Sequence, residues 1–294
     1  MKQLRNKSAV IIAGGAGIGR SMALAFAREG MSVVVADIRL DAAEQVRDEI
    51  RALGRRSIAV RTDATKVEDV RSLADTAYSE FDSVELLCNN AGVAVRPFRA
   101  VWDTSYADFK YMIDTNIWSL VHGVREFVPR MRDQPGEKHM VNTSSMGCLF
   151  IVPGNATYSL TKSAVDSFSD VIREELRPYG FGVTTLFPGL VNTGAAQLSG
   201  QLRSAEEKAA DTAVRPYHSY AAERGEVIAD VGAGRGPVVT IGAGQASVPI
   251  DPELVGPMVV RAVKANRPYC MTHPVPDGIK LRYDALMDGY HANG

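Results

Sequence analysis

The sequence has few of the features that mark specialised classes of protein. Its three cysteines, Cys88, Cys148 and Cys270, lie far apart along the chain. A sparse and odd set of cysteines is typical of reduced thiols rather than of a disulfide framework, so we predict free thiols and a cytoplasmic protein. No Cys/His spacing resembles a zinc site, and we expect no metal centre.

The chain also lacks an excess of charge of either sign. It has 33 basic and 34 acidic side chains and a formal net charge of −1. A nucleic-acid or anionic-membrane binder would be more basic, so we expect neither partner. No apolar run reaches the roughly 18 residues of a membrane span. The apolar residues 9–13 behind the basic start are too few for a signal sequence.

Short β-rich segments alternate with longer helical patterns over the first 190 residues. Several of these segments are continuous apolar runs, which are typical of strands buried on both faces of a parallel sheet. This alternation predicts an α/β fold of the doubly wound Rossmann type, with helices on both faces of the sheet. The expected strands are residues 8–13, 32–36, 57–61, 84–89, 138–143, 182–187 and 269–272.

The pattern changes beyond residue 193. Ser204 and Glu207 form a capping box that predicts a helix, and residues 225–244 hold six glycines and predict a loop. We expect one domain over residues 1–294, with residues 194–250 as an insertion that forms a lid over the substrate.

A glycine-rich segment follows the first expected strand. Residues 13–19 read Ala-Gly-Gly-Ala-Gly-Ile-Gly, and Asp37 ends the second expected strand 20 residues after Gly17. Glycines let the backbone approach a phosphate, and an acidic residue at this distance can accept the ribose hydroxyls of an adenosine. The alternatives are a plain strand–helix turn and a carboxylate that caps the next helix. The order of strand, glycines, helix, strand and acid favours a dinucleotide site.

Six motifs, in order over about residues 6–194, resemble those of the short-chain dehydrogenase/reductase family. Each motif is modest alone, but together and at the family spacing they are specific. They are the glycine loop, Asn89-Asn90-Ala91-Gly92, Asn116 within residues 115–117, Ser145 placed 13 residues before Tyr158, the Tyr-x-x-x-Lys motif of Tyr158 and Lys162, and Pro188-Gly189 with Val191 and Thr193.

The resemblance implies a seven-stranded parallel sheet, NAD as cofactor and a catalytic set of four residues. The implied catalytic residues are Asn116, Ser145, Tyr158 and Lys162. The implied cofactor-binding residues are Gly14, Gly17, Ile18, Gly19, Asp37, Asp63, Ala64, Asn90, Ala91, Gly92, Tyr158, Lys162, Pro188, Gly189, Val191 and Thr193.

The chemistry of the set explains its spacing. Tyr158 and Lys162 are four residues apart and share one helix face. A nearby ammonium favours phenolate and lowers the pKa of tyrosine from its usual value of about 10, so that Tyr158 can take an alcohol proton. Ser145 would hold the reacting oxygen, with Ser144 as the less well spaced alternative. The resemblance implies that Asn116 holds a water that links Lys162 to solvent.

The first glycine loop departs from the family pattern Thr-Gly-x-x-x-Gly-x-Gly. Ala13 replaces the threonine, and only two residues separate Gly14 from Gly17. We therefore expect a loop one residue short, a weaker hold on the pyrophosphate, and no slot for the basic side chain of many NADP-dependent enzymes.

These observations predict an NAD-dependent short-chain alcohol dehydrogenase or carbonyl reductase, acting on a small secondary alcohol or ketone. The segment near residues 269–274 is faintly similar to bacterial aryl and benzylic alcohol dehydrogenases. The resemblance also implies a homotetramer or homodimer formed through residues 105–132 and 157–179. Two alternatives stay open: a catalytically weak regulatory protein that binds cofactor, and an epimerase or dehydratase on the same fold.

Overall fold

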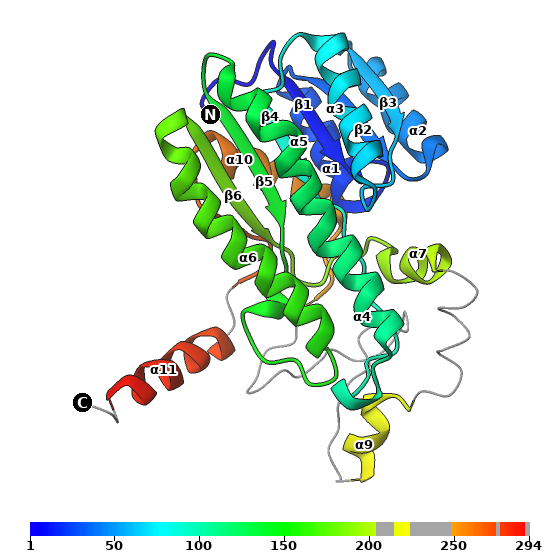
Figure 1. Cartoon of the computed structure of the whole chain (residues 1–294), viewed down its shortest axis with the longest axis vertical. Helices are drawn as coiled ribbons and strands as arrows, with labels where there is room; N and C mark the ends of the chain where they lie inside the picture. The colour runs from blue at the N-terminus through cyan, green and yellow to red at the C-terminus, as the bar shows by residue number, and fades with distance from the viewer. Residues whose placement is uncertain (204–214, 224–247, 275–276, 292–294) are drawn as a thin grey trace.

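Seven parallel strands form one sheet in the order β3-β2-β1-β4-β5-β6-β7 (Figure 1). The computed structural model describes residues 1–203, 215–223, 248–274 and 277–291. The predicted fold class is confirmed, and every expected strand is present with bounds within two residues of those expected. The strands are β1 (Ser8–Ile12), β2 (Ser32–Asp37), β3 (Ser57–Arg61), β4 (Leu86–Asn89), β5 (Lys138–Thr143), β6 (Phe181–Phe187) and β7 (Tyr269–Met271).

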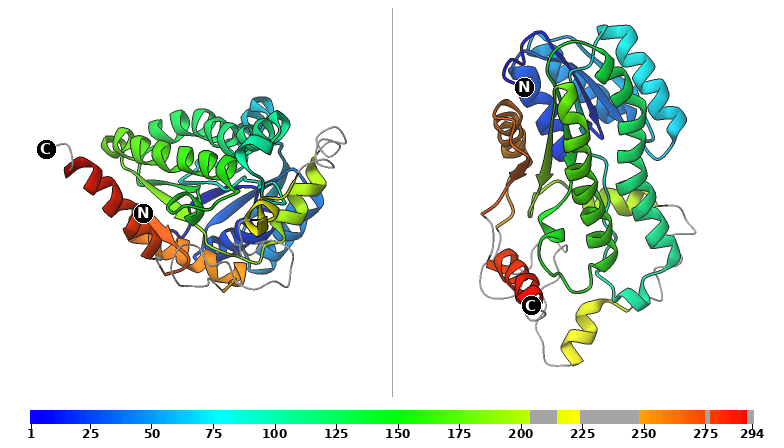
Figure 2. Two further views of the ribbon diagram at one scale, coloured as in Figure 1. Left: turned by 90° about the horizontal axis from the view of Figure 1, so that it is seen from below. Right: turned by 60° about the vertical axis from the view of Figure 1, so that its left-hand side comes forward.

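Helices cover both faces of this sheet, so the central strands are buried on both sides (Figure 2). This explains why β2 reads as a continuous run of valines, all fully buried. The longer helices are α1 (Gly17–Arg28), α2 (Leu40–Ala52), α3 (Val67–Phe81), α4 (Tyr106–Ile113), α5 (Ser119–Asp133), α6 (Ala156–Leu176), α7 (Ala195–Leu202), α9 (Tyr217–Glu223), α10 (Val255–Lys264) and α11 (Asp277–His291). Short helical turns are η1 (Val101–Asp103), η2 (Asp114–Trp118), η3 (Met146–Cys148), η4 (Arg177–Tyr179) and η5 (Pro252–Leu254).

Two apolar layers hold the sheet between its helices. One layer packs α1, α2 and α10 against one face, and the other packs α3, α5 and α6 against the opposite face. The three cysteines are buried and free, as their number predicts. Among the described residues, no helix combines the length and the apolar character needed to cross a membrane.

The strand order reverses between β1 and β4, which lie side by side at the centre of the sheet. Loops that leave the carboxyl ends of such strands diverge and open a crevice there. The helices α7 and α9, from the predicted lid, lie beyond this edge (Figure 1). The capping box at Ser204 and the glycines of residues 225–244 lie outside the described residues.

The crossing of α10 over α1 gives a test of the packing. A Cβ on Gly256 would lie 2.2 Å from the Ser21 carbonyl oxygen, and the Gly256 N–H donates to Ser21 Oγ at 2.9 Å. We expect Gly256→Ala to lower the free energy of unfolding by about 1–3 kcal/mol, because the backbones must separate.

Gly200→Ala in α7 is the matched control, since no atom lies within 4 Å of its Cβ position. It should raise the stability by up to about 1 kcal/mol. Urea unfolding midpoints measure both changes. A Gly256→Ala protein as stable as the wild type would contradict this packing.

Candidate active site

The predicted catalytic side chains meet at the carboxyl edge of the sheet, between β4, β5 and α6. Ser145 follows β5, and Tyr158 lies in the first turns of α6. A Cβ on Gly147 would lie 3.4 Å from Ser145 Oγ and 3.8 Å from Tyr158 Cε1, so the Ser145 hydroxyl and the Tyr158 ring border the same space. Ser145 Oγ also accepts the Gly147 N–H at 3.1 Å, which fixes the hydroxyl at the base of η3. Ser144 points elsewhere, because its hydroxyl donates to the Lys162 carbonyl at 2.7 Å. The structure therefore favours Ser145 over Ser144, as the spacing predicts.

Lys162 lies one helical turn beyond Tyr158 and is only 3% exposed. Its ammonium donates to the Thr143 carbonyl at the end of β5 (2.9 Å) and lies 5.8 Å from the centre of the Tyr158 ring. Gly92 makes room for it, because a Cβ there would lie 2.9 Å from Lys162 Nζ. Burial lowers the pKa of Lys162 to about 8.

The surroundings of Tyr158 act on its pKa in opposite directions. Burial raises the pKa of the phenol above its usual value, since phenolate loses hydration inside the protein. The nearby Ser145 hydroxyl and the positive charge of Arg96 lower the pKa. Arg96 follows β4 and stacks on Phe98, with 3.8 Å from its guanidinium carbon to the ring centre. The motifs gave no sign of this second cation.

Asn116 lies in the π-helical turn η2, which joins α4 to α5. Its side-chain amide accepts the Val93 N–H (2.7 Å), donates to the Val93 carbonyl (3.0 Å) and donates to Thr161 Oγ1 (2.9 Å). The amide therefore ties the loop after β4 to α6. The sequence pattern predicted a single helical run here and did not show the π turn, which occurs often at functional sites.

The glycine loop after β1 fits a phosphate. Ala16 gives α1 no side-chain cap, and the first turn of the helix has no acidic residue, so its N–H groups and positive dipole end are open to an anion. A Cβ on Gly19 would lie 1.9 Å from the Ala13 carbonyl oxygen, and Gly17 has a φ of +52°. Ile18 packs on the core cluster behind the loop.

Two residues of the loop are left-handed, Ala13 with a φ of +56° and Gly17 with a φ of +52°, whereas Gly14 is not. Ala13 is therefore an alanine at a position where the backbone favours glycine. Three residues separate Ala13 from Gly17, which is the interval between the first two glycines of the family pattern, whereas two separate Gly14 from Gly17. The predicted shortening of the loop by one residue stays a prediction. A Cβ on Gly14 would instead lie 2.9 Å from the Ile11 carbonyl oxygen, so close packing requires that glycine.

Asp37 closes the glycine loop from the end of β2. One carboxylate oxygen accepts the Gly15 N–H at 2.9 Å, and the other accepts the Arg39 N–H at 3.0 Å, next to the start of α2. The carboxylate therefore ties the glycine loop to the residue before α2 without capping that helix, and it borders the predicted adenosine site. Asp63 accepts the backbone and hydroxyl of Thr65.

The neighbouring predicted cofactor residues lie in the loops after β3 and β4. The Ala64 carbonyl lies 3.1 Å from His122 Nδ1, and Ala91 packs on the core. Asn90 donates to the Ala13 carbonyl (3.1 Å) and accepts from Thr143 (3.0 Å). It thereby ties the ends of β1, β4 and β5 together.

The Pro-Gly segment after β6 lies beside both halves of the site. The Pro188 carbonyl accepts from Met146 N at 2.9 Å, next to Ser145. Thr193 lies against Gly17, whose Cβ position would be 3.0 Å from the threonine. Val191 pairs with Ile250, so the chain beyond the lid returns to this segment. The predicted cofactor residues on β1 and β6 thus meet.

Sequence reasoning missed two groups of supporting residues. A buried chain of hydrogen bonds at 2.9 Å runs from Asn89 to Asn142 and on to Ser169, and it joins β4, β5 and α6. The Thr272 hydroxyl, just after β7, accepts the Gly189 N–H at 2.9 Å. The polar Asn89 and Asn142, at the ends of apolar strands, were the available signal for the first group.

Known proteins are similar to this chain in sequence and in fold. A family model described as short chain dehydrogenase matches residues 7–203. The 1-deoxy-11-beta-hydroxypentalenate dehydrogenase of Streptomyces exfoliatus is 34% identical over 194 residues, 66% of this chain and 70% of that protein.

Two solved structures are similar over most of the chain. A short chain dehydrogenase/reductase from Burkholderia phymatum in complex with NAD has a TM-score of 0.83 and 30% identity, covering 98% of this chain and 96% of that one. A 7α-hydroxysteroid dehydrogenase complexed with NADH and 7-oxo glycochenodeoxycholic acid has a TM-score of 0.68 and 25% identity, covering 92% and 95%.

The left-handed alanine gives a second test. We expect Ala13→Gly to raise the free energy of unfolding by about 1 kcal/mol, because glycine adopts a positive φ without a Cβ clash. Ala52→Gly, at the exposed end of α2, is the control and should lower it by about as much. Denaturant unfolding of both variants measures these changes in the free energy of unfolding. If Ala13→Gly is destabilised as the control is, residue 13 is not left-handed.

Proposed function

The chain belongs to the short-chain dehydrogenase/reductase family, and we propose that it oxidises a secondary alcohol to a ketone, and reduces the ketone in reverse, with NAD as the hydride acceptor. It is an oxidoreductase of that family. The observation that carries the finer proposal is the partly buried Tyr158, which lies beside the Ser145 hydroxyl and one helical turn before the buried Lys162. The 7-oxo ligand of the similar hydroxysteroid dehydrogenase supports an alcohol–ketone reaction.

Tyr158 moves the proton in this reaction. In the oxidation, its phenolate takes the hydroxyl proton of the alcohol while the carbinol carbon loses a hydride. Ser145 donates a hydrogen bond to the same oxygen and keeps it next to the phenol. The Lys162 ammonium, buried nearby and held by the Thr143 carbonyl, favours the phenolate by its charge. Arg96 adds a second positive charge on the side of the loop after β4.

Gly92 lies between Lys162 and Asn116. Its Cβ position lies 2.9 Å from Lys162 Nζ and 3.5 Å from Asn116 Oδ1, so only a residue without a side chain fits there. The family resemblance assigns Asn116 a water that links Lys162 to solvent, and such a water would pass the proton out of the site.

The chain's own residues fit a dinucleotide. The uncapped start of α1 would hold the pyrophosphate, Asp37 would face the adenosine ribose, and residues 188–193 would border the nicotinamide. When bound, NAD supplies the acceptor for the hydride of the carbinol carbon. The NAD complex of the similar Burkholderia phymatum structure supports this cofactor. Asp63, Ala64 and Asn90 to Gly92 complete the proposed adenosine side.

Apolar side chains on the surface support the predicted homo-oligomer. Trp118, Leu160 and Val171 are each about half exposed, and all lie in the helical segments that the family resemblance assigns to subunit contacts. Exposed apolar side chains of this size would be covered in an interface formed by these helices.

Tyr158→Phe tests the proposed function directly. Wild type should form NADH from NAD with members of a panel of secondary alcohols, and the variant should lose about 10²–10⁴-fold in kcat because the proton carrier is gone. NADH binding, measured by fluorescence, should stay nearly unchanged since the ring remains. Tyr179→Phe, on the exposed turn η4, is the control and should keep its activity. A Tyr158→Phe enzyme with more than about a tenth of the wild-type kcat would refute the role.

Asp37 should set the cofactor preference. Its charge repels a 2′-phosphate, so kcat/KM with NAD should exceed that with NADP. Asp37→Asn removes the charge but keeps an oxygen that can accept the Gly15 N–H. It should lower the ratio of kcat/KM with NAD to kcat/KM with NADP by about tenfold. Asp41→Ala, an exposed acid in the first turn of α2, should leave the preference as it is. Preference for NADP in the wild type would overturn the assignment.

A further inference from the structure

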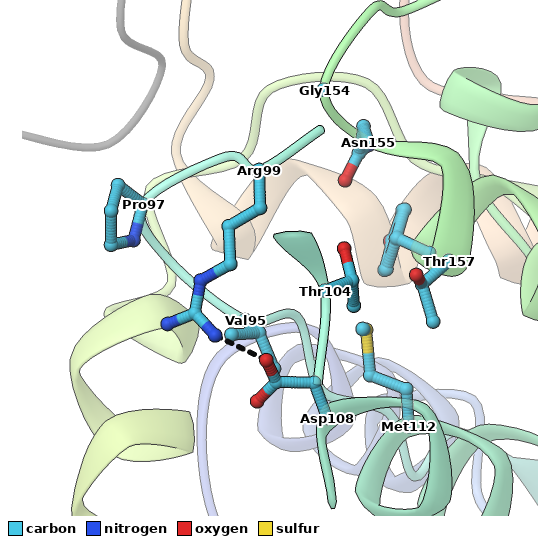
Figure 3. Close-up of a pocket in the computed structure, with 10 residues that line it drawn as sticks. Val95, Pro97, Arg99, Thr104, Asp108, Met112, Gly154, Asn155 and Thr157 are labelled. Carbon is cyan, nitrogen blue, oxygen red and sulfur yellow. Dashed lines mark hydrogen bonds and ion pairs between the residues drawn. The ribbon is translucent and has the colours of Figure 1, made fainter. Parts of the chain in front are cut away.

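A small cavity lies against Tyr158, on walls from the loop after β4, from α4 and from the start of α6 (Figure 3). It holds about 20 Å³ of free space, which is room for one water molecule or one hydroxyl group. Its lining combines polar and apolar side chains. The lining residues are Val95, Pro97, Arg99, Thr104, Asp108, Met112, Gly154, Asn155, Thr157 and Tyr158.

Thr157 is the residue that points to a ligand. It immediately precedes Tyr158 in α6 and is 4% exposed. Its hydroxyl has no hydrogen-bond partner among the residues that the structure describes. A buried hydroxyl without a partner loses about 1–3 kcal/mol relative to water, so such a group is normally satisfied by a ligand or a water. Thr104, across the cavity, already donates to the Ala100 carbonyl at 3.0 Å.

The charges in the wall decide what kind of group fits. Asp108 is fully buried and pairs with Arg99 and Arg203. A substrate carboxylate would meet the Asp108 carboxylate, and an ammonium would meet the Arg99 guanidinium, each after losing its hydration. A carboxylate is also larger than the space. The cavity therefore suits a small neutral group that both donates and accepts hydrogen bonds.

We propose that this cavity binds a second hydroxyl group of the substrate through Thr157, so that the enzyme selects diols or other polyhydroxylated secondary alcohols. This inference rests on the proposed function. Thr157 and Tyr158 are adjacent in α6 and both line the cavity. A substrate that offers one hydroxyl to Tyr158 would offer another to Thr157 through the cavity that both residues line. Val95 and Met112 pack beside the carbon skeleton that joins the two groups.

The binding of matched alcohols tests this inference, and their turnover tests the proposed function. The probes are cyclohexanol and the isomeric cyclohexane-1,2-, 1,3- and 1,4-diols. Calorimetry measures their affinity for the NADH complex, in which no oxidation occurs, and steady-state kinetics measures kcat/KM with NAD. In the wild type, at least one diol should bind about tenfold more tightly than cyclohexanol.

Three variants test whether the Thr157 hydroxyl causes the preference for a diol over cyclohexanol. Thr157→Val keeps the shape but removes the hydroxyl, and should abolish the preference for the diol while leaving cyclohexanol unaffected. Thr157→Ser should retain it. Thr104→Val is the matched control, because it removes a cavity hydroxyl that already has a partner, and the preference should persist.

The results separate two failures. Diols that bind no better than cyclohexanol, or a preference that survives in Thr157→Val, would overturn the inference, and the cavity would then hold water only. A loss of affinity for both probes in Thr157→Val would show a structural role instead and would also overturn it. Absence of turnover with every alcohol would refute the proposed function, whereas the calorimetry would still decide the binding claim.

Discussion

The burial of one ammonium group, that of Lys162, governs the arrangement of the catalytic edge. A charge inside a protein is tolerated only where polar groups replace its water. Here the Thr143 carbonyl at the end of β5 accepts from it, and Gly92, just after β4, leaves it space. The Ser144 hydroxyl holds the backbone of Lys162 in turn. The ends of two strands and one helix are therefore fixed around a single cation, and the Tyr158 phenol is fixed with them.

Much of the fold followed from local patterns. Continuous apolar runs marked the strands because a strand covered on both faces has no polar side, and the glycines and Asp37 marked the first crossover. The catalytic set followed from the resemblance to the family, and the spacing of Tyr158 and Lys162 places both on one helix face. The roles of these residues are proposals, whereas their common position at the carboxyl edge of the sheet is seen in the structure.

Other features depended on backbone conformation or on distant contacts, which a pattern does not encode. The apolar repeat through residues 105–128 is nearly the same for an α-helix and for one that contains a π turn, so the turn around Asn116 was not visible. The left-handed backbone of Ala13 is a property of the folded loop, and the count of glycines does not encode it. The bond from Gly189 to Thr272 joins residues 83 positions apart, and no local signal predicts it.

The buried cluster of Asp108 with Arg99 and Arg203 has a consequence for how this enzyme can change. It joins three segments that are far apart in sequence: the loop after β4, the first turn of α4 and the end of α7. Replacing any one member leaves a buried charge short of a partner, so the three positions are strongly coupled. A variant that accepts a new substrate, whether natural or from a mutant library, must therefore either replace all three residues together or change the other residues that line the cavity. Single-site saturation at these positions would sample mainly unstable proteins.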